Sequence, residues 1–426
     1  MQTQSQDQGF DVARIRQARG KFACMALTYF LGVFNDNFFK QAALVIAVAA
    51  GMTSMQGYAL VLFTLPFLVF AAPAGWCADR FPKRWVVITA KWMELTAMLF
   101  GAAGIAFAHW PLICCMLVIM GFQATLFSPA LNGSLPELYP AAYVPRANAV
   151  LRMLVTIAIL AGVALAGVAL DRPGTGFGGI ERGRLVVGAV VVGVALLGVI
   201  AAYGVPRRPA ADPRVAFPWD GPIRTVRDLL ATRRDPLLAV SIAADVFIWL
   251  VGSLEILIIN PLGLQQFGMS KSVTSYLIVS QLVGIGIGGL VGSRFVRGDR
   301  WYRAVGPVGV FMGLTMCALM AVPALPAALQ HGSLFVIIFA VGALAGVVLI
   351  PLESFLQVRP APERKGAVLS AVNFVVFAGV LLSGLMANGL NAHARPTTSF
   401  GLVGIAWIIL CLGLGIAYRL QEKRQC

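Results

Sequence analysis

Four polar side chains stand close together in an otherwise apolar stretch near the start of the chain. In the segment FLGVFNDNFFKQ (30–41) these are Asn35, Asp36, Asn37 and Lys40. Asp36 and Lys40 are four residues apart, so on a helix they share one face in the acid-before-base order that favours pairing. An ion pair flanked by amides can hold a zwitterionic or anionic polar group. It can equally neutralise itself and fix its helix against a neighbour.

Further acids lie in apolar stretches of the second half of the chain. Asp245 and Glu255 are about 15 Å apart along one helix, so they cannot form a single paired site. Glu353 and Gln357 again have the spacing of one helix face. A charged side chain at the centre of a membrane span costs roughly 2.5–3.5 kcal/mol, so such groups usually face a cavity or a partner. We therefore predict that these four residues line a path for a polar substrate.

Three amides and a charged pair are further polar residues in apolar surroundings. Gln123, Gln281 and Asn373 are single polar residues in their stretches, and either a cavity or an interhelical hydrogen bond would explain each of them. Lys91 and Glu94 are three residues apart, and we interpret them as an internal or snorkelling pair rather than as part of the path.

Composition shows which elements must position these residues. The chain has 426 residues, of which 59% are hydrophobic and 12% are charged. Each bilayer crossing by a helix needs roughly 20 apolar residues. Stretches of that length recur along the whole sequence, which excludes a soluble globule and a single-helix anchor. The predicted fold is an all-α membrane protein with twelve transmembrane helices at 22–49, 55–75, 85–107, 111–131, 147–170, 185–205, 237–259, 272–292, 304–325, 334–357, 367–389 and 399–418.

Two internal matches indicate that the twelve spans form two related sets of six. GWCADRF (75–81) resembles GLVGSRF (289–295), and PRANAVL (145–151) resembles ERKGAVL (363–369). Duplicated halves place a substrate site between them, near the bilayer midplane. The predicted division is a cytoplasmic segment 1–21, a half 22–205, a central loop 206–236, a half 237–418 and a tail 419–426.

Within the central loop, apolar residues follow helical spacing among arginines. This pattern predicts an amphipathic helix, which either lies on the inner membrane face or serves as a linker.

The net charge is +15, and the basic residues are distributed as the predicted topology requires. Most Lys and Arg residues fall in alternate loops, together with both termini, and this bias predicts that both termini are cytoplasmic. A nucleic-acid partner is therefore not expected. We expect no removable signal peptide, no metal site, no cofactor and no ATP hydrolysis, because the corresponding patterns are missing. The sequence does not predict an enzyme.

The segment GWCADRFPKR (75–84) resembles the signature loop of the major facilitator superfamily. Physically, its acid Asp79 could accept hydrogen bonds from helix N-termini and arginines of the opposing half and so form a latch. The alternative is a basic loop that only fixes topology. The predicted gating residues are Gly75, Asp79, Arg80, Lys83 and Arg84, with Arg294 in the second copy, where Ser293 replaces the acid.

Three segments resemble a narrower family, the bacterial lysophospholipid transporters. They are FLGVFNDNFFKQAALV (30–45), LFSPALNGSLPEL (126–138) followed by RANAVL (146–151), and IPLESFLQVRPAPERKGAVLSAVNF (350–374). They also resemble the transporter domains fused to acyl-acyl-carrier-protein synthetase/acyltransferase enzymes. The resemblance implies a flippase that moves lysophospholipids, such as 2-acyl-glycerophosphoethanolamine, from the outer to the inner leaflet of the inner membrane. A cytoplasmic acyltransferase would then re-acylate them, and Asp36 would contact the headgroup or switch the halves.

Two other hypotheses remain open at this point. The intramembrane acids are also suited to a proton- or sodium-coupled exporter of amphipathic drugs or small metabolites. A basic cytoplasmic face would suit a non-transporting scaffold that recruits an acyltransferase. We expect the protein to function as a monomer in contact with membrane lipid.

Overall fold

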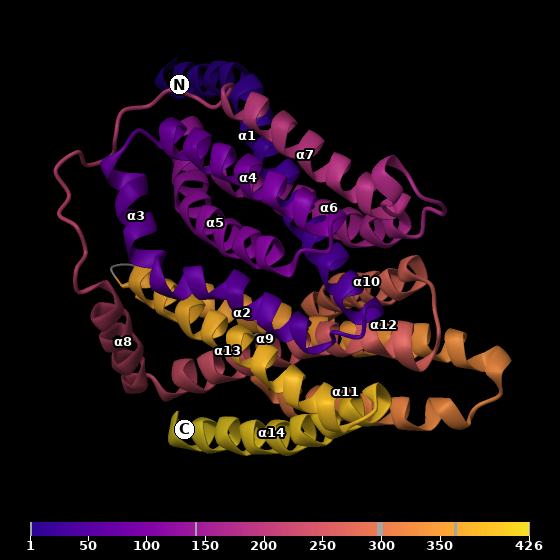
Figure 1. Ribbon diagram of the computed structural model, residues 1–426. Coiled ribbons are helices and arrows are strands. Elements are labelled where there is room, and N and C mark those ends of the chain that lie inside the picture. The colour runs from indigo at the N-terminus through magenta and orange to yellow at the C-terminus, as the bar shows by residue number, and fades with distance from the viewer. Residues whose placement is uncertain (1, 141–142, 296–300, 362–363, 426) are drawn as a thin grey trace. The chain divides into compact units, whose positions relative to one another are not determined.

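The computed structural model describes residues 2–140, 143–295, 301–361 and 364–425, and these are almost entirely helical (Figure 1). Short helical turns, η1–η5, extend or connect the main helices. The main helices are α1 (Gln2–Ala49), α2 (Ser54–Val69), α3 (Ala71–Arg80), α4 (Lys83–Ala106), α5 (Trp110–Leu138), α6 (Val144–Leu170), α7 (Arg182–Ala202), α8 (Gly221–Ala231), α9 (Pro236–Pro261), α10 (Lys271–Phe295), α11 (Val305–Ala318), α12 (Ala327–Val358), α13 (Lys365–His393) and α14 (Pro396–Gln425).

The helices match the predicted membrane spans. Among the described residues, ten helical segments are long and apolar enough to cross a membrane, and the bent pair α2–α3 supplies an eleventh. α1 covers the first predicted span, and the polar cluster lies in the middle of that span. Helices predominate because a chain in lipid must satisfy its backbone hydrogen bonds internally. The prediction of an all-α, multi-pass membrane protein is confirmed. The amphipathic segment of the central loop forms α8, also as predicted.

The second span differs from the prediction of one continuous stretch over 55–75. α2 ends at Val69 and α3 begins at Ala71, with a bend of 53° between them. Pro73 explains the break, because a proline donates no backbone hydrogen bond and its ring crowds the carbonyl of the residue four positions earlier, here Val69. Gly75 and Arg80 of the signature segment therefore lie in α3. The segment is non-helical only between the end of α3 at Arg80 and the start of α4 at Lys83.

The chain forms two compact units. Unit 1 contains Met1–Ala43 and Leu65–Gly221, and unit 2 contains Leu44–Thr64 and Pro222–Cys426. The end of α1 and most of α2 therefore pack as part of unit 2. The boundaries of the two predicted six-helix halves stay a prediction.

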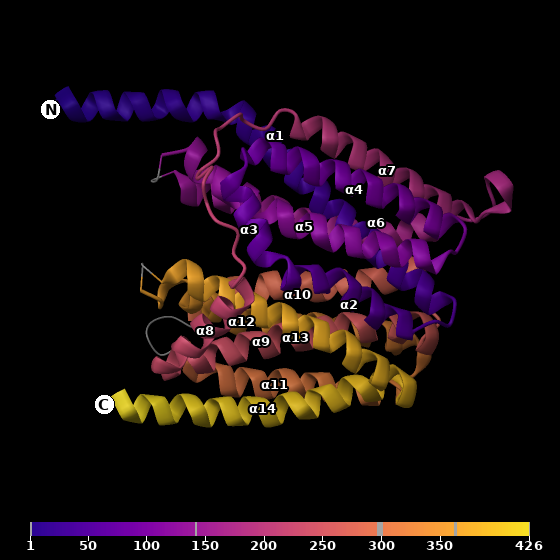
Figure 2. The same ribbon diagram turned by 60° about the vertical axis from the view of Figure 1, so that its left-hand side comes forward.

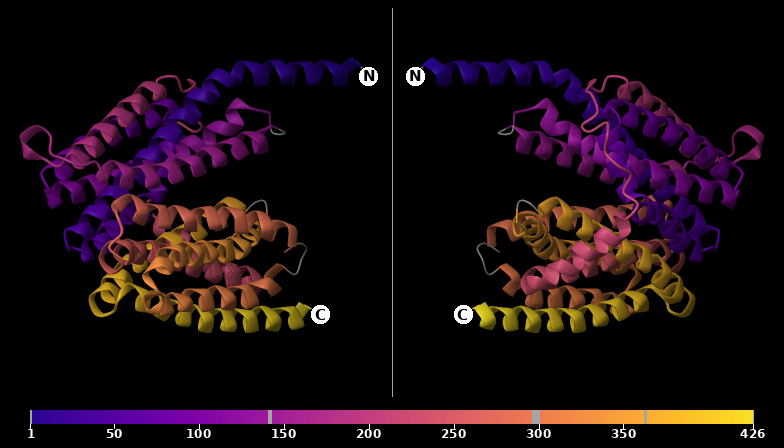
Figure 3. Two further views of the ribbon diagram at one scale, coloured as in Figure 1. Left: turned by 90° about the vertical axis from the view of Figure 1, so that its right-hand side faces the viewer. Right: turned by 90° about the vertical axis from the view of Figure 1, so that its left-hand side faces the viewer.

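Unit 1 is built around α4, which packs against α5 and α7 (Figure 2). A cluster of buried apolar side chains, including Met25, Val87 and Leu131, forms part of its core. The N-terminal part of α1 extends beyond the other helices of its unit (Figure 3). The polar residues of α1 thus lie in the part of the helix that α4, α6 and α7 contact.

Unit 2 holds its helices together by close backbone contact. α10 packs on α12 along a glycine face, where a Cβ at Gly292 would lie only 2.8 Å from the Val347 carbonyl oxygen. This explains the repeated glycines of α10 as a packing seam. α14 packs against α11, and α13 packs against α9 (Figure 2).

Candidate translocation site

The polar cluster of α1 is connected to a buried network inside unit 1. Asn35 is fully buried, and its side-chain nitrogen donates to Glu94 Oε1 at 3.3 Å and to the Val191 carbonyl oxygen at 3.1 Å. One amide thereby links α1 to α4 and α7. The sequence analysis interpreted Asn35 as part of a polar cluster that could bind a substrate. In the structure Asn35 also has a structural role, because it links three helices.

Lys91 and Glu94 form the centre of this network. Lys91 Nζ lies 2.6 Å from Glu94 Oε2, and both side chains are almost completely buried. Lys91 Nζ also lies 5.0 Å from the centre of the Phe127 ring on α5, within range of a cation–π contact. The ammonium group sits directly against α1, where a Cβ at Gly32 would come within 2.5 Å of it. The predicted internal pair is confirmed, and its lysine does not snorkel.

Asp36 lies next to this network and has spare bonding capacity. Its side chain is half-buried, and its Oδ1 atom is buried without a hydrogen-bond partner among the described residues. Its carboxyl group interacts electrostatically with Lys40 on its own helix and with Lys91 and Glu94 on α4. Gly32, which precedes Asp36 by four residues, allows Lys91 this close approach. Asp36 is therefore an acid held near two cations and one acid.

The other two predicted residues of unit 1 have different surroundings. Asn37 donates to the Val33 carbonyl oxygen of its own helix at 2.8 Å. It faces α6, because a Cβ at Gly162 would lie 3.2 Å from the Asn37 Cβ. Gln123 is buried, and its nitrogen lies 3.9 Å from the Met120 sulfur, a weak contact. The structure does not bring Gln123 into the network around Asn35.

In unit 2, Glu255 of α9 pairs with an amide from the next helix. Gln281 of α10 donates to Glu255 Oε2, and both side chains are buried. Glu255 Oε1 and Gln281 Oε1 lie buried without partners among the described residues. A carboxyl and an amide that each keep one acceptor atom unused can receive a donor from a third group.

Asp245 lies at a separate position on α9 and is close to another acid. It is buried, interacts electrostatically with Glu353 of α12, and accepts a side-chain hydrogen bond from Trp249 on its own helix. The structure thus brings together two acids that are far apart in the sequence. Gln357 and Asn373 are exposed.

The signature segment is anchored within unit 1. Lys83 forms an ion pair with Glu137 at the end of α5, and Arg84 Nη2 donates to the Tyr203 carbonyl oxygen at 2.7 Å. Asp79 accepts a backbone hydrogen bond from Asp212 N at 3.0 Å through its main-chain oxygen.

The remaining predicted gating residues are Gly75, Asp79, Arg80 and Arg294, and their described contacts do not test the predicted latch. The Asp79 carboxylate is exposed, and Gly75 and Arg80 lie half-buried on α3. Arg294 belongs to α10, but its side chain lies outside the described residues. The latch stays a prediction.

Sequence reasoning missed a polar contact where the start of α2 meets α9 in unit 2. Gln56 donates to the Leu257 carbonyl oxygen at 3.2 Å and accepts from Asn260 at 2.9 Å. A Cβ at Gly57 would lie 2.7 Å from the side-chain carbon of Asn388, which shows how closely α2 approaches α13. In the sequence, Gln56 is visible only as an amide next to an apolar stretch. That position does not indicate which residues it contacts.

Solved transporter structures share this fold. A D-xylose–proton symporter superposes with a TM-score of 0.69 at 16% identity, covering 92% of this chain and 96% of that one. A bacterial homologue of the human lysosomal transporter Spinster gives a TM-score of 0.70 at 15% identity, covering 94% and 97%. The profile of the Major Facilitator Superfamily matches residues 25–384. The chain is a membrane transporter of the Major Facilitator Superfamily, and not an enzyme.

Sequence relatives narrow this class further. A lysophospholipid transporter LplT from Enterobacter sp. (strain 638) is 30% identical over 347 residues, which cover 79% of this chain and 80% of the relative. The LplT of Escherichia coli O157:H7 (strain EC4115 / EHEC) is 26% identical over 399 residues, covering 92% and 91%. Within the superfamily, the chain belongs to the family of these LplT transporters.

Proposed function

We propose that this transporter carries lysophospholipids, such as 2-acyl-glycerophosphoethanolamine, across the bacterial inner membrane. The observation that carries the proposal is the Asp36 carboxyl group, which has a buried oxygen without a partner and lies beside Lys40 and Lys91. The relatives named lysophospholipid transporter supply the substrate class.

The chemistry of the headgroup fits this arrangement. A glycerophosphoethanolamine headgroup carries one ammonium and one phosphate. In this proposal Asp36 accepts from the ammonium, and Lys40, which interacts with Asp36 on the same helix, attracts the phosphate. Charge-assisted hydrogen bonds of this kind are about twice as strong as neutral ones, which offsets the loss of water at mid-membrane. Asn35 and Glu94 hold the helix that presents both groups.

In this proposal the two six-helix halves alternate access to a site between them, and the lipid moves from the outer to the inner leaflet. Both termini face the cytoplasm, as the distribution of basic residues indicates. A cytoplasmic acyltransferase consumes the product. Flux down that consumption gradient requires no coupling ion, and the protein works as a monomer.

One observation favours a second candidate, the ion-coupled exporter of amphipathic compounds. Asp245 and Glu353 come from different helices and interact with each other, and Glu255 is buried on the same helix as Asp245. Chains of buried acids are the groups that proton-driven transporters use. The experiment therefore has to separate ion coupling from substrate class.

The test uses spheroplasts that contain the transporter together with a cytoplasmic acyltransferase. Labelled lysophosphatidylethanolamine is added outside, and its conversion to diacyl lipid is followed over time. Wild type is compared with Asp36→Asn, which keeps the shape of the side chain and removes its charge. Glu181→Gln is the matched control, because Glu181 is an exposed acid at the N-cap of α7 that pairs only with Arg184 among the described residues.

We expect conversion to require the transporter, to survive an uncoupler, and to fall about ten- to a hundred-fold in Asp36→Asn, as expected for one lost charge-assisted hydrogen bond. Glu181→Gln should match wild type. Conversion no faster than in cells without the protein would exclude the lipid as substrate. Transport that stops with the uncoupler would instead favour the ion-coupled candidate.

A further inference from the structure

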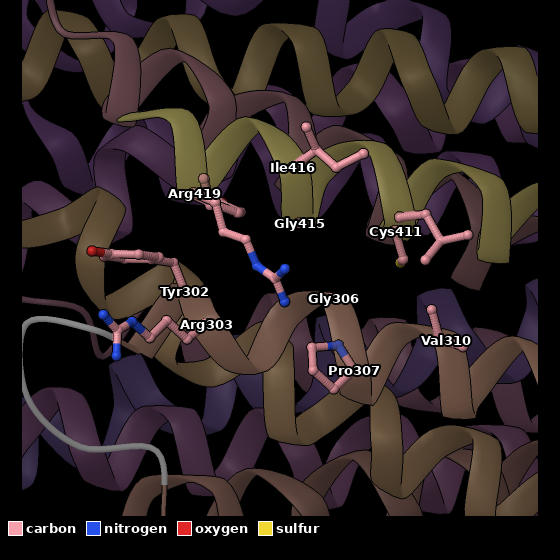
Figure 4. Close-up of a pocket in the computed structure, with 11 residues that line it drawn as sticks. Tyr302, Arg303, Gly306, Pro307, Val310, Cys411, Gly415, Ile416 and Arg419 are labelled. Atoms are coloured by element: carbon pink, nitrogen blue, oxygen red, sulfur yellow. The ribbon is translucent and has the colours of Figure 1, made fainter. Parts of the chain in front are cut away.

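Unit 2 contains a groove between α11 and α14 that the proposed transport does not use. It has a volume of about 640 Å³, in the range of pockets that hold small molecules (Figure 4). Its floor is formed by Gly306 and Gly415, where the two helices approach so closely that a Cβ at Gly415 would lie 3.6 Å from the Gly306 Cα. Without side chains at these two positions, the space above them stays open.

One end of the groove is strongly basic. Arg303 and Arg419 line it, and both side chains are exposed. Figure 4 shows the Arg419 side chain reaching from α14 toward Gly306. The described residues that line the groove include no aspartate or glutamate. This end therefore carries two exposed arginine side chains that can contact an anionic group in the groove.

The positions of the two arginines are fixed by the aromatic residues that precede them. Tyr302 and Tyr418 stack with their ring centres 5.4 Å apart, and both rings are buried. The Tyr418 hydroxyl group lies 3.2 Å from Ser241 Oγ on α9. Each arginine directly follows one of the stacked tyrosines. The stack therefore holds the two cationic residues on the same end of the bundle.

The rest of the groove is apolar and runs along the helices. Val310 and Ile416 line it, and Ile416 is 60% exposed. From Cys411 to Arg419 the groove follows α14 for about 12 Å. Half of a bilayer's hydrocarbon core is about 15 Å thick, so an acyl chain in one leaflet can follow this groove for most of its depth.

We propose that this groove binds an anionic diacyl glycerophospholipid of the surrounding membrane. The phosphate group contacts Arg303 and Arg419, and one acyl chain lies over the glycine floor. Basic pockets between transmembrane helices on the cytoplasmic side are suited to such headgroups. The basic end coincides with the C-terminal end of α14, so the assignment to the inner leaflet rests on the proposed orientation. Binding itself does not depend on which substrate the protein transports.

The test measures lipid binding to the full-length protein, purified and delipidated in detergent, by native mass spectrometry. Phosphatidylglycerol and phosphatidylcholine are added as the anionic and neutral probes. The variants are Arg303→Gln/Arg419→Gln, which removes both charges, and Arg419→Lys, which keeps the charge. Gly415→Leu fills the floor of the groove. Gly413→Leu is its matched control on the same helix, because a Cβ at Gly413 meets no atom within 4 Å.

We expect wild type to prefer phosphatidylglycerol, and the double arginine variant to bind it about thirty-fold more weakly. Arg419→Lys and Gly413→Leu should bind like wild type, and Gly415→Leu should bind neither lipid well. The exposed arginines make the double variant informative even if Gly415→Leu fails to fold. An unchanged preference in the double variant would overturn the proposal. So would lysophosphatidylglycerol displacing the diacyl lipid at equal concentration, because that would assign the groove to a transport substrate.

Discussion

The buried pair of Lys91 and Glu94 allows a prediction in which the structure sets both the size and the order of the effects. The perturbations are Glu94→Gln, Lys91→Met and the two together. Each single change leaves one buried charge without its closest partner at 2.6 Å. Breaking a buried pair in this way typically costs about 3–5 kcal/mol, whereas removing both charges is often neutral or stabilising.

The surroundings decide where each variant falls in that range. After Glu94→Gln, Lys91 still has Asp36 within electrostatic reach, so the cost should be about 3 kcal/mol. After Lys91→Met, Asp36 and Glu94 remain as two neighbouring acids, and Lys40 is the remaining cation that acts on Asp36 among the described residues, so the cost should approach about 5 kcal/mol. The double variant removes Lys91 and one of the two acids, and should lie closer to wild type than either single variant.

The assay is the free energy of unfolding in a titration of mixed micelles with denaturing detergent. A double-mutant cycle then gives the coupling between the two residues. Glu181→Gln is the control, because Glu181 at the N-cap of α7 and Arg184 are also three residues apart and pair at 3.1 Å, but Glu181 is 59% exposed. An exposed pair of this kind contributes below about 1 kcal/mol. We therefore expect almost no change in the control.

Two results would refute the reasoning. If both single variants stayed within about 1 kcal/mol of wild type, the pair would not act as a desolvated ion pair. If the double variant lost the sum of the single losses, the two residues would act independently, and Asn35 rather than Lys91 would have to be the partner that matters to Glu94. A larger loss for Glu94→Gln than for Lys91→Met would contradict the role given to Asp36.

Two further predictions concern unit 2. Gly292→Val should destabilise the fold strongly, because the new Cβ would lie 2.8 Å from a carbonyl oxygen of α12. Gly286→Val on the same helix is the control, because a Cβ at Gly286 meets no atom within 4 Å. The melting temperature of this control should stay within a few degrees of wild type. Asp235→Ala should lower the free energy of unfolding by about 1–2 kcal/mol, because Asp235 caps α9 by accepting from Leu238 N at 3.2 Å. Arg359→Gln removes only the half-exposed ion-pair partner of Asp235 at 2.7 Å, and should lower it by less than about 1 kcal/mol. Equal effects within either pair of variants, measured as the melting temperature in detergent, would contradict the assigned contacts.

The all-helical fold could be predicted because lipid imposes it. A backbone in the hydrocarbon core cannot bond to water, so apolar stretches of about 20 residues have to be helices. Pairs on one helix could be predicted for a similar reason, since spacing alone brings their side chains together. Lys91 and Glu94 were found in this way, and the structure joins them by an ion pair.

Partners on different helices could not be predicted from the sequence. Nothing in the sequence pairs Glu255 with Gln281, and only the packing of α9 against α10 brings them into contact. Asp245 and Glu353 are likewise joined through tertiary structure. The bend before α3 was missed because mean hydropathy measures how apolar a stretch is. It carries no information on whether a proline such as Pro73 breaks the helix within that stretch.

The polar cluster of α1 shows why such a group of residues cannot be assigned one role. Successive residues on a helix point about 100° apart, so neighbours in the sequence contact different partners. Asn35 contacts α4 and α7, Asn37 faces α6, and Asp36 shares its face with Lys40. The structural contacts of Asn35 and Asn37 fix the rotation of α1 in its unit. In the proposed function, that fixed rotation is the condition for Asp36 to present its carboxyl group to a substrate, because a helix free to turn would bury the acid against a neighbouring helix instead.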